Sequence, residues 1–219
     1  MLNKDIIEAV LFDLDGTLMD TDDQTVKALE GRLSRLRWPS PRRMARRIVM
    51  RSETPANWLM TLLDILGLDR WPVALSTWYR LRTGGPAQPV FSAIAGMKAV
   101  LSSLHARYRL GIVTTRSAQD AAAFLNQYGI IELFDVVVTR ESTKRLKPHP
   151  APILYAADAL GLAPQQCVMV GDTTVDMAAA RRAGAWAVGV LCGFGEREEL
   201  KRAGAHLLLE STADVSSVL

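Results

Sequence analysis

Short apolar runs rich in branched side chains alternate with helical patterns along most of this 219-residue chain, and this alternation constrains the fold most strongly. The first run, IIEAVLF at residues 6–12, stops at DLDGT, which predicts a buried strand followed by a glycine-containing turn. Similar runs predict four further strands, at residues 110–113, 136–139, 168–170 and 187–191. Strands that alternate with helices form parallel sheets covered on both faces, so we predict an α/β fold.

Apolar residues recur at helical spacing between these runs. The helical patterns cover residues 97–104, 121–128, 153–160 and 175–182. Ser117 suits the N-cap of the second helix, and Gly184 suits the end of the last one.

Residues 18–92 interrupt this alternation. They contain several helical stretches and Pro/Gly punctuation at residues 39–41 and 84–89, but no convincing strand pattern. We interpret them as a helical domain inserted after the first strand, which divides the core domain into residues 1–17 and 93–219.

Polar residues suited to catalysis follow the predicted strands. They are Asp13 and Asp15 after the first strand, Thr114 and Thr115 after the second, Lys147 on the loop beyond the third, and Asp172 and Asp176 after the fourth. Because the carboxyl ends of parallel strands meet at one edge of the sheet, we expect these side chains to form one site.

The residue types in this set are those that phosphoryl transfer needs. Clustered carboxylates repel one another and require a cation, and oxygen ligands suit Mg²⁺. A metal, an ammonium and hydroxyl donors would stabilise the charge of a transferring phosphoryl group. One carboxylate can act as the nucleophile and form an aspartyl phosphate, while its neighbour two residues on serves as acid and then base. Gly16 permits the tight backbone path between the two.

With these motifs the chain resembles the haloacid dehalogenase-like hydrolase superfamily, in particular its phosphoglycolate phosphatase-like group with a helical (C1-type) cap. The matching segments are FDLDGTLMDT (12–21), GIVTTR (111–116), LKPHPAPILYAADALGL (146–162) and VGDTTVDMAAARRAGAWAVGV (170–190). The resemblance implies a Rossmann-like parallel sheet core with helices on both faces. It also implies a small all-helical cap, residues 18–92, inserted after strand 1.

The resemblance also assigns a role to each site residue. Asp13 would be the nucleophile and a metal ligand, and Asp15 the general acid/base that gives the metal its backbone carbonyl. Thr114, with the backbone N–H of Thr115, would hold the phosphoryl oxygens, and Lys147 would neutralise nucleophile and phosphate. The remaining metal ligands would be Asp172 and Asp176, the latter directly or through water. Dehalogenating members lack the second acid of the first motif, so Asp15 favours phosphoryl chemistry.

The positive charge is concentrated in the predicted cap. Residues 18–92 hold 12 cationic and seven acidic side chains, a net charge of +5, although the whole chain carries only +3. Arg47 and Arg51 share a helical face, and we expect them to hold the distal anionic group of a substrate. The aromatic interleaving typical of single-strand binders is poor, so we predict a small anionic phosphorylated substrate and no nucleic-acid partner.

Composition places the chain in a reducing compartment. Two cysteines, Cys167 and Cys192, are too few for a disulfide framework, and both read as buried residues of core strands. The short apolar run near the N-terminus is flanked by acids, and no long uncharged apolar segment follows. We therefore expect a cytoplasmic protein without a membrane partner, either a monomer or a homodimer.

The motifs leave two alternatives to a phosphatase. A phosphosugar mutase of the β-phosphoglucomutase type uses the same four motifs but returns the phosphoryl group to a sugar instead of water. A non-catalytic relative that binds a phosphorylated ligand is the other, although such proteins lose motif acids and this chain keeps all of them.

Overall fold

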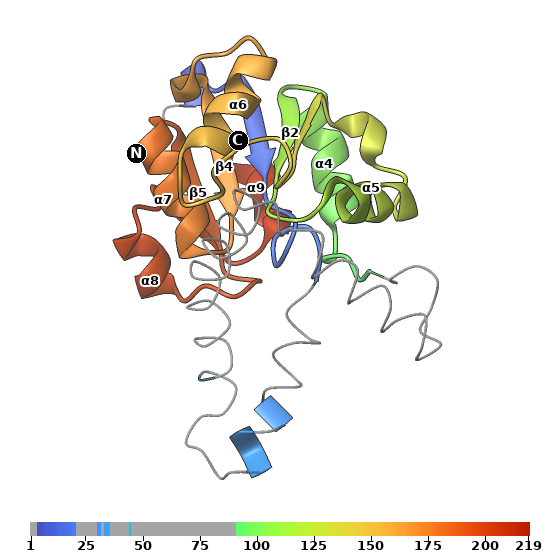
Figure 1. Ribbon diagram of the computed structural model, residues 1–219, viewed down its shortest axis with the longest axis vertical. Helices are drawn as coiled ribbons and strands as arrows, with labels where there is room; N and C mark the ends of the chain where they lie inside the picture. Colours follow the sequence, from blue (N-terminus) through green and yellow to red (C-terminus); the bar gives the residue numbers. More distant parts are fainter. Residues whose placement is uncertain (1–3, 21–29, 32, 36–43, 45–90) are drawn as a thin grey trace.

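The computed structural model describes residues 4–20, 30–31, 33–35, 44 and 91–219, and its centre is a parallel β-sheet (Figure 1). The strands are β1 (Ala9–Phe12), β2 (Arg109–Val113), β3 (Val136–Val138), β4 (Cys167–Gly171), β5 (Trp186–Val190) and β6 (Leu207–Leu209). Within the described residues they form a six-stranded sheet in the order β3-β2-β1-β4-β5-β6, and every neighbouring pair is parallel. The predicted α/β class is therefore confirmed.

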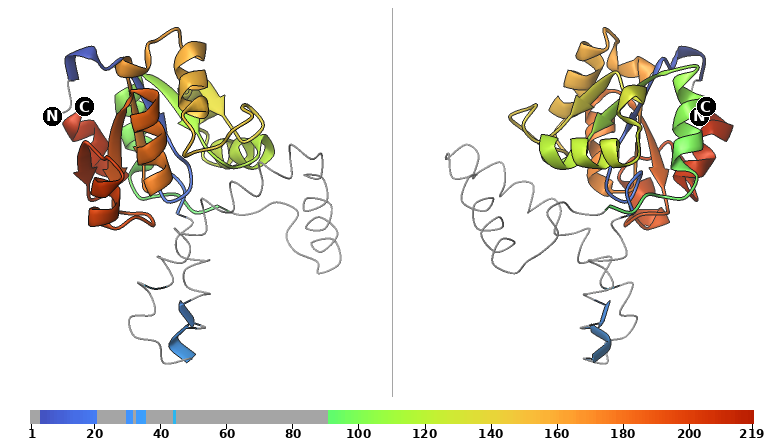
Figure 2. Two further views of the ribbon diagram at one scale, coloured as in Figure 1. Left: turned by 60° about the vertical axis from the view of Figure 1, so that its left-hand side comes forward. Right: turned by 90° about the vertical axis from the view of Figure 1, so that its right-hand side faces the viewer.

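Helices cover both faces of the sheet, as two views show (Figure 2). On one face lie α4 (Met97–His105), α5 (Ala118–Gln127) and the short α9 (Val215–Val218), which pack with one hydrophobic cluster. On the other lie α6 (Ala151–Ala159), α7 (Thr174–Ala183) and α8 (Arg197–Arg202). The side chains of β1 alternate between these two clusters, because Val10 and Phe12 join the first and Ala9 and Leu11 the second.

The predicted helix ends agree with the structure. The Ser117 side chain accepts a hydrogen bond from the backbone N–H of Asp120, so it caps the N-terminus of α5. Gly184 adopts a left-handed conformation (φ 79°) and ends α7.

Two strand predictions need correction. Residues 6–8 were expected to belong to the first strand, but Lys4–Ile6 form a 3-10 turn and β1 begins only at Ala9. Ile6 is exposed, so the apolar pattern there overstated the buried segment. The sequence analysis also missed β6, whose three leucines lie at the sheet edge and pair with β5 alone among the described strands.

The segment by which the chain leaves the core, residues 18–20, lies beside the segment by which it returns, residues 92–94. Met19 bridges Ala93 in antiparallel fashion, the Asp20 N–H donates to the Ser92 carbonyl (2.9 Å), and the Ile94 N–H donates to that of Leu18 (2.9 Å). The two ends of the predicted insertion therefore lie next to each other. Nearly all of the predicted cap lies outside the described residues, so its helical fold and its boundaries stay predictions.

The part of the chain that the structure describes holds no helix long and apolar enough to cross a membrane. Cys167 is a buried residue of β4, as expected, and is unpaired with the other cysteine. Cys192 lies just after β5 and is half-buried, so its placement within a strand was wrong.

Candidate active site

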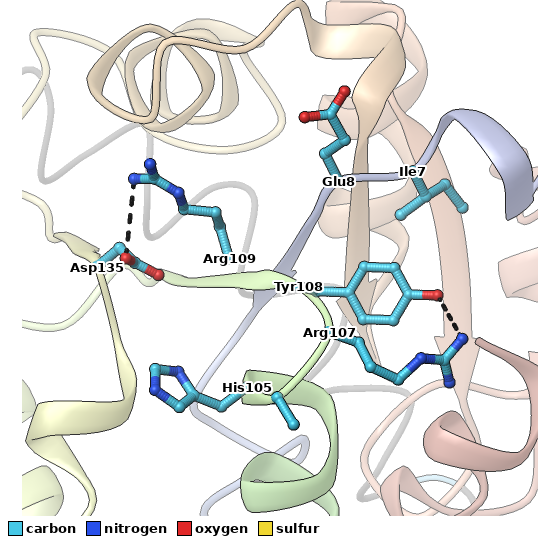
Figure 3. Close-up of a pocket in the computed structure, with 8 residues that line it drawn as sticks. Ile7, Glu8, His105, Arg107, Tyr108, Arg109 and Asp135 are labelled. Atoms are coloured by element: carbon cyan, nitrogen blue, oxygen red, sulfur yellow. Dashed lines mark hydrogen bonds and ion pairs between the residues drawn. The ribbon is translucent and has the colours of Figure 1, made fainter.

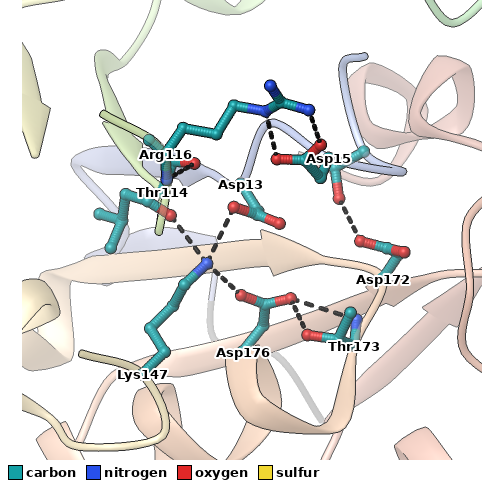
Figure 4. Close-up of polar contacts among 10 residues, drawn as sticks. Asp13, Asp15, Thr114, Arg116, Lys147, Asp172, Thr173 and Asp176 are labelled. Atoms are coloured by element: carbon teal, nitrogen blue, oxygen red, sulfur yellow. Dashed lines mark hydrogen bonds and ion pairs between the residues drawn. The ribbon is translucent and has the colours of Figure 1, made fainter. Parts of the chain in front are cut away.

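The carboxyl ends of β1, β2 and β4 bring the predicted catalytic side chains to one edge of the sheet (Figure 4). Asp13 follows β1, Thr114 follows β2 and Asp172 follows β4. The backbone extends the sheet beyond the strands, because the Asp13 N–H donates to the Val170 carbonyl (3.0 Å) and the Thr114 N–H to that of Val138 (2.9 Å). All three side chains are buried.

Lys147 is the centre of this site. Its Nζ donates to Asp13 Oδ1 (2.9 Å), to Asp176 Oδ1 (2.6 Å) and to the Val113 carbonyl (2.9 Å), and its side chain is only 2% exposed. The loop between β3 and α6 thus supplies the cation that two buried carboxylates need.

Burial and the charges of neighbouring groups shift the pKa values of Asp13 and Lys147. Burial raises the pKa of Asp13 to about 7 against the opposing charge of Lys147, and the carboxylates of Asp176 and Asp15 add to the rise. Burial by itself lowers the pKa of Lys147, but Asp13 and Asp176 outweigh this effect and raise it above its ordinary value. The lysine therefore stays charged, and the nucleophile candidate lies in an environment that disfavours its ionised form.

Asp176 lies in the first turn of α7 and is fixed from two sides. Its Oδ2 accepts hydrogen bonds from the Thr173 hydroxyl (2.6 Å) and the Thr173 N–H (3.1 Å), while Oδ1 receives Lys147. A carboxylate at this position also complements the helix N-terminus. Asp176 therefore orients the lysine as well as belonging to the acidic group.

Asp172 is held by Thr17 and Phe194, two residues whose contacts with it the sequence analysis did not predict. Its Oδ1 accepts from the Thr17 hydroxyl (3.1 Å), and its Oδ2 accepts from the backbone N–H of Phe194 (2.7 Å). Both Gly16 and Gly193 border the same carboxylate, since a Cβ atom there would lie 2.2 Å and 2.1 Å from Asp172 Oδ2. Only residues without a side chain fit at these two positions.

Asp15 points away from the other three carboxylates and pairs with Arg116. The Arg116 Nε donates to Asp15 Oδ2 (2.7 Å) and its Nη2 to Asp15 Oδ1 (2.6 Å), which is a bidentate ion pair. Burial opposes the charge of Arg116, but the hydrogen bonds and charge of Asp15 raise its pKa overall. The sequence analysis placed Arg116 in the matching segment 111–116 but assigned it no role.

The two threonines after β2 differ in exposure. Thr114 is buried and its Oγ1 accepts from the Arg116 N–H (3.1 Å), which leaves its own hydroxyl hydrogen to donate. Thr115 is half-buried on the same loop. The two cap candidates for substrate binding, Arg47 and Arg51, lie outside the described residues.

Three carboxylates of the site fit a divalent cation. Asp13, Asp172 and Asp176 each offer an oxygen, these oxygens all lie within 4.8 Å of one another, and all three residues are buried. When all three are ionised, their negative charges exceed the single positive charge of Lys147, and hard oxygen donors in small number suit Mg²⁺ completed by water and substrate. The Asp15 side chain is not part of this group, because Arg116 holds it elsewhere.

The residues that sequence reasoning missed have one feature in common. Thr17, Arg116, Thr173 and Phe194 act by holding a carboxylate of the site, and three of them reach an acid more than 20 residues away in the chain. Thr173 could have been found, because a threonine three residues before an acid at a helix start is a capping signal. The partners of the others depend on how the loops meet in space.

A parallel α/β sheet with clustered acids and a buried lysine at its carboxyl edge has the groups that phosphoryl transfer needs. The family model of the haloacid dehalogenase-like hydrolases matches residues 10–190, and the chain belongs to this family. The predicted family is thereby confirmed.

Individual relatives agree with this assignment. The phosphoglycolate phosphatase of Neisseria meningitidis is 32% identical over 203 residues, which cover 87% of this chain and 83% of that protein. Pyrophosphatase PpaX of Anoxybacillus flavithermus is 28% identical, and the match covers 97% of both chains. The crystal structure of a hydrolase from Pseudomonas syringae is 30% identical with a TM-score of 0.68, over 96% of both chains. The predicted phosphatase class and phosphoglycolate phosphatase-like group are confirmed by these comparisons.

Proposed function

We propose that this protein is a Mg²⁺-dependent phosphatase that hydrolyses a small phosphorylated metabolite through an aspartyl phosphate on Asp13. The observation that carries the proposal is the buried contact of Lys147 with both Asp13 and Asp176, beside a third buried carboxylate. Such an arrangement is costly for a protein that uses it only for stability. It supports electrostatic stabilisation of a transferring phosphoryl group.

In the proposed reaction, Asp13 attacks phosphorus with the oxygen that Lys147 does not hold. Oδ1 accepts from Lys147, so Oδ2 forms the new O–P bond as the bond to the leaving oxygen breaks. Asp15 has to leave its ion pair with Arg116 and take up a proton first; it then donates that proton to the leaving oxygen and takes one back from the water that cleaves the aspartyl phosphate. The Thr114 hydroxyl and the Thr115 N–H bind the phosphoryl oxygens, and Lys147 offsets their charge.

Asp13, Asp172 and Asp176, with the backbone carbonyl of Asp15, would hold Mg²⁺. The ion supplies positive charge next to the phosphoryl oxygens when bound. Arg47 and Arg51 of the cap are proposed to hold the distal anionic end of the substrate. We further propose a cytoplasmic location, which suits two cysteines that do not pair with each other.

Removal of the metal provides the direct test. Wild-type protein treated with EDTA is expected to release no phosphate from 2-phosphoglycolate, pyrophosphate, nucleotides or sugar phosphates, and added Mg²⁺ is expected to restore release from at least one of them. The reason is that three buried acids with one lysine need a further cation before they can accept an anionic substrate. Full activity in excess EDTA would contradict the metal assignment. Hexose 1-phosphates that are isomerised without phosphate release would instead indicate the mutase.

Gly16 offers a structural test with a matched control. Its φ of 71° is almost that of Gly161 (69°), so alanine at either position carries a similar backbone strain of about 1–2 kcal/mol. A Cβ at Gly16 would lie 2.2 Å from Asp172 Oδ2, whereas nothing lies within 4 Å of one at Gly161. We expect Gly16→Ala to lower phosphate release at least about tenfold and Gly161→Ala to leave it near the wild-type rate. Equal losses in kcat/KM would show that the position of Asp172 is unimportant.

A further inference from the structure

Two arginines flank His149 on the loop between β3 and α6. Arg145 Nη1 lies 3.2 Å from His149 Nε2, and Arg182, in the last turn of α7, donates through Nη1 to the carbonyl of Pro148 (2.7 Å). We propose that Arg145, His149 and Arg182 bind a tetrahedral oxyanion such as phosphate or sulfate, at a site separate from the proposed active site. The site is independent of the proposed phosphatase function.

Both ring nitrogens of His149 lie opposite N–H donors. The backbone N–H of Ala151, the first residue of α6, donates to Nδ1 (3.1 Å), and the guanidinium of Arg145 faces Nε2. A neutral imidazole carries a hydrogen on one of its two nitrogens, and an imidazolium carries one on each. Because the start of the helix fixes the backbone donor, Nδ1 is the accepting nitrogen and Nε2 carries the hydrogen. Arg145 and His149 therefore bring two N–H donors together, and these donors need an oxygen that accepts from both.

The charges around His149 favour an anion over water as that acceptor. Neither Arg145 nor Arg182 forms an ion pair with a carboxylate among the described residues. Burial lowers the pKa of His149, and the positive charges of Arg145 on its own loop and Arg182 on α7 lower it further. No carboxylate in the described part of the chain offsets the two arginines at this ring. An oxyanion would be attracted by both guanidinium groups and would accept hydrogen bonds that a carbonyl or a carboxylate accepts elsewhere.

The donors are accessible and already held in place. Arg145 and Arg182 are exposed, and His149 is half-buried. The Ala151 N–H orients the imidazole, and the bond from Arg182 Nη1 to Pro148 joins α7 to the loop, while Arg182 Nη2 makes no hydrogen bond within the described residues. An anion would thus meet donors on two connected elements and would require little rearrangement of the backbone.

The hollow of about 450 Å³ near the start of β2 lacks this pattern, although it also contains a histidine and two arginines (Figure 3). The three residues are His105, Arg107 and Arg109. Arg109 pairs there with Asp135 (3.8 Å), and Arg107 donates to the Leu219 carbonyl (2.7 Å). Both arginines of the hollow have acceptors, so His105 is a suitable reference within the same protein.

His206 provides a second comparison, with a single arginine. Its Nδ1 accepts from the Ala187 N–H (3.0 Å), and Arg181 Nη1 lies 2.6 Å from its Nε2. The ring also packs against Trp186, with ring centroids 4.8 Å apart. Since one guanidinium attracts an anion less strongly than two, we expect a weaker response to anions at His206 than at the proposed site.

The chain has only three histidines, so NMR can follow each of them. The pKa of each imidazole is measured in Mg²⁺ buffer from the pH dependence of its signals, in sodium sulfate and in sodium chloride of equal ionic strength. Sulfate is expected to raise the pKa of His149 by about half a unit or more relative to chloride, because a bound anion stabilises the imidazolium. We expect a smaller rise for His206 and none for His105. A rise at His149 no larger than that at His105 would show that no anion binds there, and would overturn the proposal.

Arginine variants separate this site from anion binding elsewhere in the protein. In Arg145→Gln and in Arg182→Gln, the pKa of His149 in chloride is expected to rise toward its ordinary value, because a neighbouring cation is removed. Its further rise in sulfate is expected to fall to about half or less of the wild-type rise. Arg140→Gln removes another arginine of the same loop, which pairs with Glu141 (3.0 Å), and should leave the rise unchanged. If the full rise persists in both Arg145→Gln and Arg182→Gln, the anion binds elsewhere and the proposal is wrong.

Discussion

Asp13→Asn is expected to reduce phosphate release by about 10⁴-fold or more, because an amide cannot form the aspartyl phosphate and the remaining groups cannot replace a nucleophile. This substitution should leave the contacts around the site intact. Asn keeps the shape of the side chain, and its carbonyl oxygen can still accept from Lys147 Nζ. Steady-state phosphate release from the best substrate in Mg²⁺ measures the effect.

Loss of folding can be separated from loss of chemistry in this variant. Burial raises the pKa of Asp13, so a neutral amide relieves an unfavourable charge, and we expect the melting temperature in Mg²⁺-free buffer to be no lower than that of the wild type. Asp5→Asn is the matched control, since Asp5 is exposed in the 3-10 turn before β1. If Asp13→Asn releases phosphate at the wild-type rate, Asp13 is not the nucleophile.

The sequence predicted the sheet and the acids at its edge because both depend on local patterns. Each buried strand is a short apolar run, and Asp13, Thr114 and Asp172 stand directly after such runs. In a parallel sheet this position alone determines which edge a residue occupies. The predicted strand boundary was wrong where an apolar run continued outside the sheet, as at residues 6–8.

The bonds that orient these acids could not be read from the sequence. Asp15 and Arg116 are separated by 101 residues, and Thr17 and Asp172 by 155. Their pairing depends on which strands are neighbours, and the order β3-β2-β1-β4 places β1 between β2 and β4. The loop after β1 therefore contacts the loops on both sides. Its Asp15 pairs with Arg116 of the loop after β2, and its Thr17 donates to Asp172 of the loop after β4.

These contacts divide the four acids of the site into different roles. Asp172 is held by a backbone N–H of the loop after β5, and Asp176 by Thr173 at the start of α7 and by Lys147. Asp13 is held by Lys147 as well, and Asp15 by Arg116. Three of the acids and the lysine are almost fully buried, so their charges depend on each other and not on water. The stability of the core domain should therefore depend strongly on the lysine.

Lys147→Met tests this dependence with a side chain of similar length. Removing the cation leaves Asp13 and Asp176 buried without their shared partner, and breaking a buried ion pair costs about 3–5 kcal/mol of unfolding free energy. For a chain of this size we expect the melting temperature in Mg²⁺-free buffer to fall by about 10 °C, and phosphate release to be lost as well. Thermal and denaturant unfolding measure the first effect.

The cause of this loss can be isolated with two further variants. Lys98→Met removes an exposed lysine whose Nζ donates only to the Tyr128 carbonyl among the described residues, and it should change stability by no more than about 0.5 kcal/mol. Asp13→Asn combined with Lys147→Met removes one of the two buried carboxylates that Lys147→Met leaves without a cation. The double variant should therefore be more stable than Lys147→Met alone. If Lys147→Met unfolds at the wild-type temperature, the lysine does not compensate the buried carboxylates, and the electrostatic basis of the proposed site fails with it.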